Sequence, residues 1–143
     1  MAIELDPKSA YAYNKRGHAY LGLQQYDEAF ADFTKAIELD PKSAYAYNSR
    51  GVVYKKLDQY DMAIIDYTKA IELDPKSAYY NSRGFAYGKL KQFGKAIADY
   101  TKAIELEPKS ALAYFNRGHA YLNMGKKKEA EADFAKAKML KGN

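Results

Sequence analysis

The chain has 143 residues, of which 48% are hydrophobic and 29% charged, and its net charge is +5. This length and hydrophobic content indicate a folded domain with a buried core and argue against disorder. No apolar run approaches the ~18 residues that a membrane span needs, and the N-terminus lacks the apolar core of a secretory signal. The absence of cysteine excludes disulfides and thiolate metal sites. We therefore expect a cytoplasmic protein that does not enter a membrane.

The positive charge gives little reason to expect a nucleic-acid partner. Lysines are scattered along the chain, with one short cluster at Lys126, Lys127 and Lys128. Binding to nucleic acid or to a membrane surface needs a focused basic stripe. We interpret the lysines as solvated surface.

The sequence repeats itself four times. The string AIELDPKSAYAYN stands at residues 2–14 and again at 36–48, and its first nine residues recur almost unchanged from Ala70 and Ala103. Four prolines and four glycines mark the repeats: Pro7, Pro41, Pro75 and Pro108, and Gly17, Gly51, Gly84 and Gly118. The predicted organisation is a single array over residues 1–143, with repeats at about 10–43, 44–76, 77–110 and 111–143 and with residues 1–9 as the tail of an incomplete preceding repeat.

Each repeat predicts two helices. The first helix begins after a serine, whose hydroxyl can accept a hydrogen bond from a free backbone N–H. These serines are Ser9, Ser43, Ser77 and Ser110, and the helices run to about Leu23, Leu57, Leu90 and Met124. The second helix carries an apolar stripe at helical spacing and ends before the next proline. We expect eight helices of about 12–15 residues in four hairpins.

One residue is missing between Pro75 and Gly84, where AYAYN of the first two repeats has become AYYN. The loss of one residue changes the phase of a helix by about 100°. The sequence therefore predicts a local irregularity around Ser77 to Tyr80, with the regular pattern restored by Arg83.

The hairpins must pack against one another. A hairpin of about 30 residues cannot bury enough apolar surface to offset the entropy lost when it becomes ordered. Small residues let the two helices of a hairpin approach closely. They are the four glycines above, beside Ala29, Ala63, Ala96 and Ala130.

The repeat resembles the tetratricopeptide repeat, whose pattern is aromatic-x2-Leu-Gly-x2-Tyr, then Ala-x3-Phe, then Ala and Pro. The first two repeats match it at Tyr13, Gly17, Tyr20, Ala29, Phe33, Ala36 and Pro41, and at Tyr47, Gly51, Tyr54, Ala63, Tyr67, Ala70 and Pro75. The last two match at Tyr80, Gly84, Tyr87, Ala96, Tyr100, Ala103 and Pro108, and at Tyr114, Gly118, Tyr121, Ala130, Phe134 and Ala137. The resemblance covers nearly the whole chain. It implies an all-α fold, a right-handed α-solenoid (superhelix) of four antiparallel helix pairs, with a concave groove along the first helices.

The chain departs from that pattern at two positions of each repeat. Arginine replaces the leucine before the glycine, and the second helix carries an aspartate: Arg16, Arg50, Arg83 and Arg117, and Asp32, Asp66, Asp99 and Asp133. One interpretation is a ladder of arginines that binds acidic ligands. The other is a partly buried ion pair in each hairpin, which we favour because an unpaired buried guanidinium is costly.

The resemblance also implies which residues of the first helices would line the groove. From the first two repeats they are Tyr11, Asn14, Lys15, His18, Leu21 and Gly22, and Tyr45, Asn48, Ser49, Val52, Lys55 and Lys56. From the last two they are Asn81, Ser82, Phe85, Gly88 and Lys89, and Leu112, Phe115, Asn116, His119, Leu122 and Asn123. The asparagines would hold the backbone of an extended peptide, aromatic residues would supply pockets, and lysines would favour an acidic ligand. The alternative is that the polar residues are only solvated surface.

One subclass of the family clamps the C-terminal carboxylate of heat-shock chaperones with lysine, asparagine and arginine residues of its first helices. The corresponding positions here hold Asn14 and His18, then Ser49, and then Ala78 and Ser82. We therefore expect no strong binding to chaperone tails.

We find no pattern of a catalytic, cofactor or metal site. The two histidines, His18 and His119, are three repeats apart, too far to share a metal ion or form a catalytic pair. No nucleotide-binding loop, zinc-protease motif or serine-protease set occurs. The sequence therefore predicts a protein that is not an enzyme.

The predicted function is a protein–protein interaction module that binds a peptide or partner segment, acidic or extended, in its groove. The alternative is a structural or engineered scaffold. Apolar surface at the ends of the array would let chains of such a scaffold stack end to end.

Overall fold

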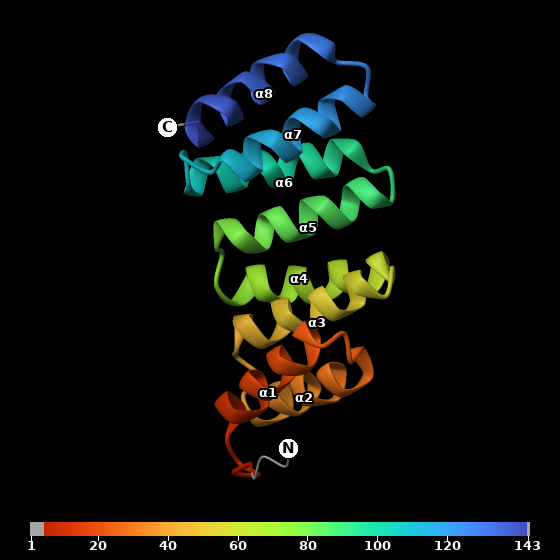
Figure 1. Ribbon diagram of the computed structural model, residues 1–143, viewed down its shortest axis with the longest axis vertical. Coiled ribbons are helices and arrows are strands. Elements are labelled where there is room, and N and C mark those ends of the chain that lie inside the picture. Colours follow the sequence, from red (N-terminus) through yellow and green to blue (C-terminus); the bar gives the residue numbers. More distant parts are fainter. Residues whose placement is uncertain (1–4, 143) are drawn as a thin grey trace. The chain divides into compact units, whose positions relative to one another are not determined.

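The computed structural model of the protein describes residues 5–142. Within that range the chain forms eight helices and no strand (Figure 1). Their bounds are α1 Ala10–Gly22, α2 Tyr26–Leu39, α3 Ala44–Lys56, α4 Tyr60–Leu73, α5 Ser77–Lys89, α6 Phe93–Leu106, α7 Ala111–Asn123 and α8 Lys127–Lys141. None of these helices is long and apolar enough to cross a membrane. The predicted all-α class with four helix pairs is confirmed.

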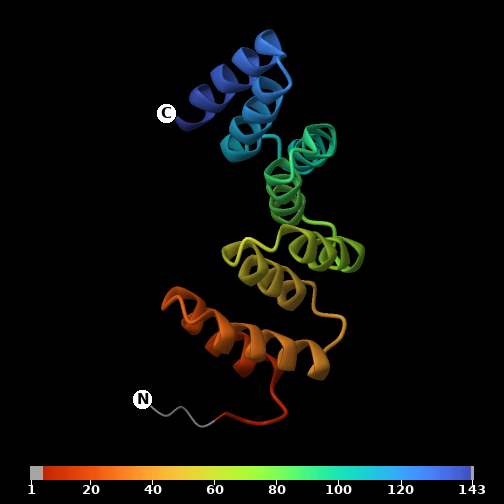
Figure 2. The ribbon, with the colours of Figure 1, turned by 90° about the vertical axis from the view of Figure 1, so that its right-hand side faces the viewer.

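The helices form four hairpins, because each first helix packs against the helix that follows it. The chain divides into two compact units, the first ending at Asp74 and the second beginning at Pro75. In the first unit α2 also packs against α3, and in the second unit α6 also packs against α7. Figure 2 shows α7 and α8 of the last hairpin lying side by side.

The boundaries of the array stay predictions. The single array of four repeats stays a prediction, because the two compact units are each described by themselves. Of the predicted tail at residues 1–9, residues 1–4 lie outside the described part of the chain. Residues 5–9 are not helical, and a turn at Pro7 and Lys8 leads into α1.

Three of the four serines cap a first helix as predicted. Ser9, Ser43 and Ser110 each accept a hydrogen bond from the backbone N–H three residues later, at 3.1–3.2 Å. The prediction is wrong for Ser77, which is the first residue of α5, since Lys76 takes the cap position without a side-chain bond. The Ser77 hydroxyl instead donates to the Ala103 carbonyl of α6 at 3.0 Å. The shortened turn therefore produces the predicted local irregularity.

The turn inside each hairpin has one residue in the left-handed region. These residues are Gln24, Asp58, Lys91 and Gly125, with φ between 59° and 77°. In the first hairpin the N–H of the following residue, Gln25, donates to the Tyr20 carbonyl at 2.9 Å, and the Gln24 N–H donates to the Leu21 carbonyl at 3.0 Å. This pair of bonds is the Schellman motif, which satisfies carbonyls at a helix C-terminus. The other three hairpins repeat the same bonds.

The two helices of each hairpin approach most closely at the repeated glycine of the first helix. The side chain that lies against this glycine is an aromatic ring of the second helix, not the alanine named in the sequence analysis. A Cβ atom added to Gly51 would lie 2.6 Å from Cε1 of Tyr67, and one added to Gly17 would lie 2.8 Å from Cε1 of Phe33. Tyr67 and Phe33 are fully buried. Glycine is therefore required because the ring of the second helix occupies the space of a side chain.

Candidate peptide-binding surfaces

The four arginines of the first helices pair with the four aspartates of the second helices. In each hairpin Nε and Nη2 of the arginine donate to the two carboxylate oxygens at 2.7–2.9 Å. The aspartates are only 2–5% exposed. The predicted ion pairs are confirmed, and the interpretation of the arginines as an acid-binding ladder is wrong because their donors face these carboxylates.

Aromatic rings hold each guanidinium further, and a threonine hydroxyl also accepts a hydrogen bond from Arg50 and from Arg117. The Arg50 guanidinium lies 5.7 Å from the ring centroid of Tyr47 and 5.8 Å from that of Phe30. Its Nη1 donates to the Thr34 hydroxyl at 3.4 Å, which ties α3 to the preceding hairpin. The hydrogen bonds to Asp66 raise the pKa of Arg50 above its ordinary value, although burial opposes the rise. These arginines are structural links between helices.

The predicted asparagine ladder is less accessible than expected. Asn14 is only 9% exposed, and Asn48 and Asn81 are half-buried. The Oδ1 atoms of all three are buried and have no hydrogen-bond partner within residues 5–142. An acceptor that is closed to solvent cannot take a hydrogen bond from a ligand backbone. These asparagines therefore do not form an open row of hydrogen-bonding groups.

In the first unit His18 links α1 to α3. Its ring lies 5.2 Å from the rings of Phe33 and Tyr45, and its Nε2 lies 3.1 Å from the Ser49 hydroxyl. Burial lowers the pKa of His18 below its ordinary value of 6.5. Ser49 is 2% exposed, so it does not face a ligand as predicted.

A pocket of about 400 Å³ lies beside His18. Of the predicted groove residues it brings together four: His18, Leu21, Gly22 and Lys56. It also includes Gln24 and Tyr26, which the sequence analysis did not select.

Five other predicted residues of this unit do not line that pocket. Tyr11 and Tyr45 are 71% and 50% exposed, and the Lys15 ammonium lies 5.6 Å from the Tyr11 ring centroid. Val52 and Lys55 are half-buried. Burial, and then the neighbouring charge of Lys56, lower the pKa of Lys55. These residues lie on the first helices as predicted, without forming one site.

The second unit brings more of the predicted residues into one pocket. Its volume is about 330 Å³, and it lies between α5 and α7 with α6 beneath it. The predicted residues that line it are Phe85, Gly88, Lys89, Phe115, Asn116, His119 and Asn123. We call it the aromatic pocket. Asn81 and Ser82 lie outside it, and the Ser82 hydroxyl donates to the Ala78 carbonyl of its own helix at 3.0 Å.

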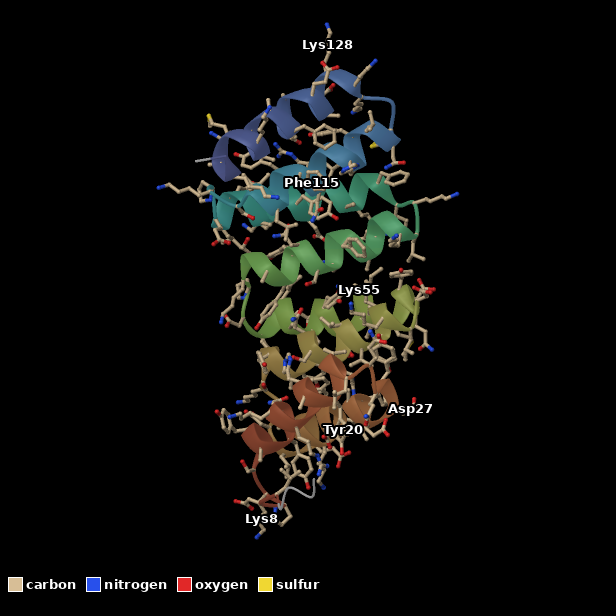
Figure 3. The ribbon with its side chains drawn as sticks, viewed as in Figure 1. Lys8, Tyr20, Asp27, Lys55, Phe115 and Lys128 are labelled. Carbon is tan, nitrogen blue, oxygen red and sulfur yellow. The ribbon has the colours of Figure 1, made fainter. Side chains whose placement is uncertain are left out.

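Aromatic rings in edge-to-face contact support one wall of the aromatic pocket. The His119 ring lies 4.6 Å from Phe115 and 4.9 Å from Phe134, in edge-to-face geometry. The Lys89 ammonium lies 5.4 Å from the Phe85 ring centroid. Figure 3 labels Phe115 on α7. An aromatic or aliphatic side chain would pack on these rings, with a lysine and an amide at the rim.

Sequence analysis missed the residues that close this pocket from below, which are Phe93, Tyr100 and Ala120. Tyr100 and Ala120 are 4% exposed. The repeat pattern contains a signal for Tyr100, because it stands at the aromatic position of the second helix. The predicted groove consists of first helices alone, whereas Phe93 and Tyr100 lie on α6. Among residues 5–142 no cluster of histidine and carboxylate side chains could hold a metal ion.

The hairpins, the glycine crossings and the pockets on the first helices together define a helical-repeat scaffold for protein interactions. The chain belongs to the tetratricopeptide repeat family. Family models of the tetratricopeptide repeat match residues 10–43, 44–77 and 111–143, and a TPR repeat model matches residues 86–125. No curated protein sequence matches the chain.

Solved structures support the same fold. A crystal structure of MamA is 30% identical, with a TM-score of 0.89 over 96% of this chain and 81% of that one. PilF of Pseudomonas aeruginosa is 28% identical, with a TM-score of 0.86 over 94% of this chain and 62% of that one. The first TPR of Spaghetti (RPAP3), bound to the HSP90 peptide SRMEEVD, is 26% identical, with a TM-score of 0.80 over 87% of this chain and 99% of that one.

Proposed function

We propose that the protein is a non-catalytic interaction module and that the aromatic pocket of the second unit anchors a peptide segment of a partner. The observation that carries this proposal is the gathering of Phe85, Phe115 and His119 around a hollow of about 330 Å³. Phe85 and Phe115 are 37% and 48% exposed, so they offer apolar surface to solvent. Such aromatic anchors supply most of the binding energy in many interfaces.

The charge at the rim favours an acidic neighbour of the anchor residue. Lys89 lies beside Phe85, and Asn116 and His119 add polar groups that can donate hydrogen bonds. We therefore propose a ligand with an aromatic or aliphatic side chain next to aspartate or glutamate. The pocket beside His18 in the first unit, with Lys56 at its edge, would bind a second segment of similar chemistry.

Selection from a random peptide library tests this ligand class. The expected peptides share an apolar anchor and an adjacent carboxylate, and the double variant Phe85→Ser/Lys89→Glu binds them about tenfold more weakly. Lys95→Glu is the matched control, because Lys95 is an exposed lysine of α6 outside the pocket. Peptides that bind the double variant as well as the original protein would contradict the proposal.

We also propose that the chain does not bind chaperone tails, although the related RPAP3 structure holds an HSP90 peptide. The clamp positions hold neither lysine nor arginine, Asn14 is buried, and Ser49 is bound to His18. Calorimetry with the peptide SRMEEVD and its C-terminal amide should give no detectable heat. Micromolar binding that disappears with the amide would show that a clamp exists.

Self-association through the ends of the array is the alternative function that we propose. Sedimentation velocity over a wide range of concentrations tests it directly. A sedimenting mass that rises with protein concentration would favour a self-assembling scaffold. A monomer at all concentrations would contradict the self-association alternative.

A further inference from the structure

A third pocket lies on the last hairpin, between the first residues of α7 and the last turns of α8. It is lined by Leu112, Phe115, Phe134, Ala137, Lys138 and Lys141, and its volume is about 730 Å³. We call it the end pocket. Its floor is apolar and its two lysines are exposed. Leu112 is 60% exposed, so a large apolar side chain faces solvent here.

The repeats show what occupies the equivalent place on another hairpin. In the first unit Ala36 and Ile37 of α2 form a buried cluster with Ala46 of α3, against which Tyr47 also packs. Ala36 and Ala46 are fully buried. Ala36 and Ile37 are the repeat equivalents of Ala137 and Lys138. Most of the surface that forms the end pocket on α7 and α8 is therefore equivalent to one that the first turns of a helix cover on α1 and α2. The exception is Leu112, whose equivalent Tyr11 remains 71% exposed.

The charge of the end pocket differs from that of its equivalents. Lys138 stands where the first and third repeats have Ile37 and Ile104, and Lys141 stands where they have Asp40 and Glu107. A helix that covers the end pocket must therefore meet two cations. Carboxylates in its first turn would meet them and would also interact favourably with the positive end of its own dipole.

We propose that the end pocket binds the first turns of an acidic amphipathic helix of another protein. Small residues of that helix pack on Ala137 and between Leu112 and Phe134, as Ala46 packs on Ala36. Its carboxylates pair with Lys138 and Lys141. This site is separate from the aromatic pocket in its chemistry, although Phe115 contributes to both.

A second copy of the chain is a poorer occupant. Its α1 resembles α3 in sequence, but Lys15 stands where α3 has the buried Ser49. By the repeat equivalence, docking of α1 would bring Lys15 to His119 and would leave Lys138 facing a helix without carboxylates. A lysine buried against His119 and a Lys138 ammonium without a carboxylate both oppose association.

The test uses two labelled helical peptides built on residues 43–57, the segment that covers this surface on the first hairpin. Both carry Lys55→Ala and Lys56→Ala. The acidic probe adds Ser43→Asp and Tyr47→Glu, and the basic probe adds Ser43→Lys and Tyr47→Lys. Fluorescence anisotropy with the whole chain should give about tenfold tighter binding of the acidic probe at low salt.

Three variants locate the binding. Lys138→Glu/Lys141→Glu should reverse the preference, so that the basic probe binds more tightly. Lys126→Glu/Lys128→Glu changes the net charge equally and should keep the original preference, because Lys128 extends from α8 at the other end of the helix (Figure 3). Leu112→Ser should weaken both probes about tenfold through the lost apolar contact.

Several outcomes would overturn the proposal. One is equal affinity for the two probes, and another is an unchanged preference in Lys138→Glu/Lys141→Glu. A third is loss of binding of the acidic probe in Phe85→Ser, because this loss would show that the probe binds in the aromatic pocket. Sedimentation of the whole chain completes the test. Self-association that Leu112→Ser abolishes would show that a second copy is the occupant.

Discussion

The ion pair between Arg50 and Asp66 predicts a large cost for its removal. Asp66 has a side-chain exposure of 3%, and Arg50 supplies both of its hydrogen bonds at 2.8 and 2.9 Å. Arg50→Ala leaves this carboxylate buried and unpaired, which should lower the free energy of unfolding by about 3 kcal/mol. Urea unfolding followed by circular dichroism measures the loss. Arg16→Ala should cost less, because the Arg16 side chain is 30% exposed. Unchanged stability in Arg50→Ala would contradict the structural role.

A side chain added at Gly51 should have a steric cost that the same change at an exposed glycine does not have. A Cβ atom at Gly51 would lie 2.6 Å from Tyr67, whereas one at Gly94 would have no atom within 4 Å. Gly51→Leu should therefore destabilise the protein by about 1–3 kcal/mol. Gly94→Ala is the matched control and should stabilise α6 by about 0.5–1 kcal/mol. Thermal unfolding separates the two outcomes, and equal melting temperatures would refute the crowded crossing.

His18 predicts a loss of stability as the pH falls. Because burial lowers the pKa of folded His18, the unfolded chain binds a proton first as the pH drops through the ordinary value of 6.5. The free energy of unfolding should therefore decrease below that pH. His18→Phe, which introduces the residue that the third repeat has at Phe85, should flatten this decrease. Melting curves between about pH 5 and 8 test it, and identical curves for both proteins would contradict it.

The hairpin turns are elements that three of the four repeats build without glycine at the left-handed position. Lys91 has a φ of 62°, whereas Gly125 at the equivalent position has a φ of 77°. The left-handed conformation costs roughly 1–2 kcal/mol for a residue with a side chain. Glycine avoids this cost, but its larger conformational entropy in the unfolded chain cancels part of the gain in stability. Lys91→Gly should therefore raise the free energy of unfolding by about 0.5–1 kcal/mol. Gly125→Lys should lower it by a similar amount, and the pair can be compared by urea unfolding.

Sequence reasoning placed the helices because the apolar period and the prolines act locally. It did not foresee the Schellman turns, because Gln24 and Lys91 are not residues that prefer a positive φ. It also assigned a cap to Ser77 by analogy with Ser43. The lost residue moves Ser77 into the first turn of α5, where its hydroxyl meets the Ala103 carbonyl. A contact between segments that are distant in the sequence decided that outcome.

At the scale of the whole molecule, the sequence identified the walls of the candidate site better than its floor. Phe85, Phe115 and His119 were expected on the first helices and meet in one pocket. Ser49 was expected there too, but it is buried because His18 of the preceding hairpin lies against it. A repeat pattern gives the face of a helix, and packing between hairpins decides which residues of that face reach solvent.

The charge distribution of the whole molecule predicts weak binding to nucleic acid. All four arginines are used in ion pairs with buried aspartates, so lysines alone carry the net charge of +5. Their densest cluster, Lys126, Lys127 and Lys128, lies at the start of α8. Because phosphate binding depends on many cations acting together, we expect no binding of 20-base single- or double-stranded DNA tighter than about 10⁻⁴ M at physiological salt. Anisotropy with labelled oligonucleotides measures this. Submicromolar binding that Lys126→Glu/Lys128→Glu abolishes would show that the cluster is a nucleic-acid site.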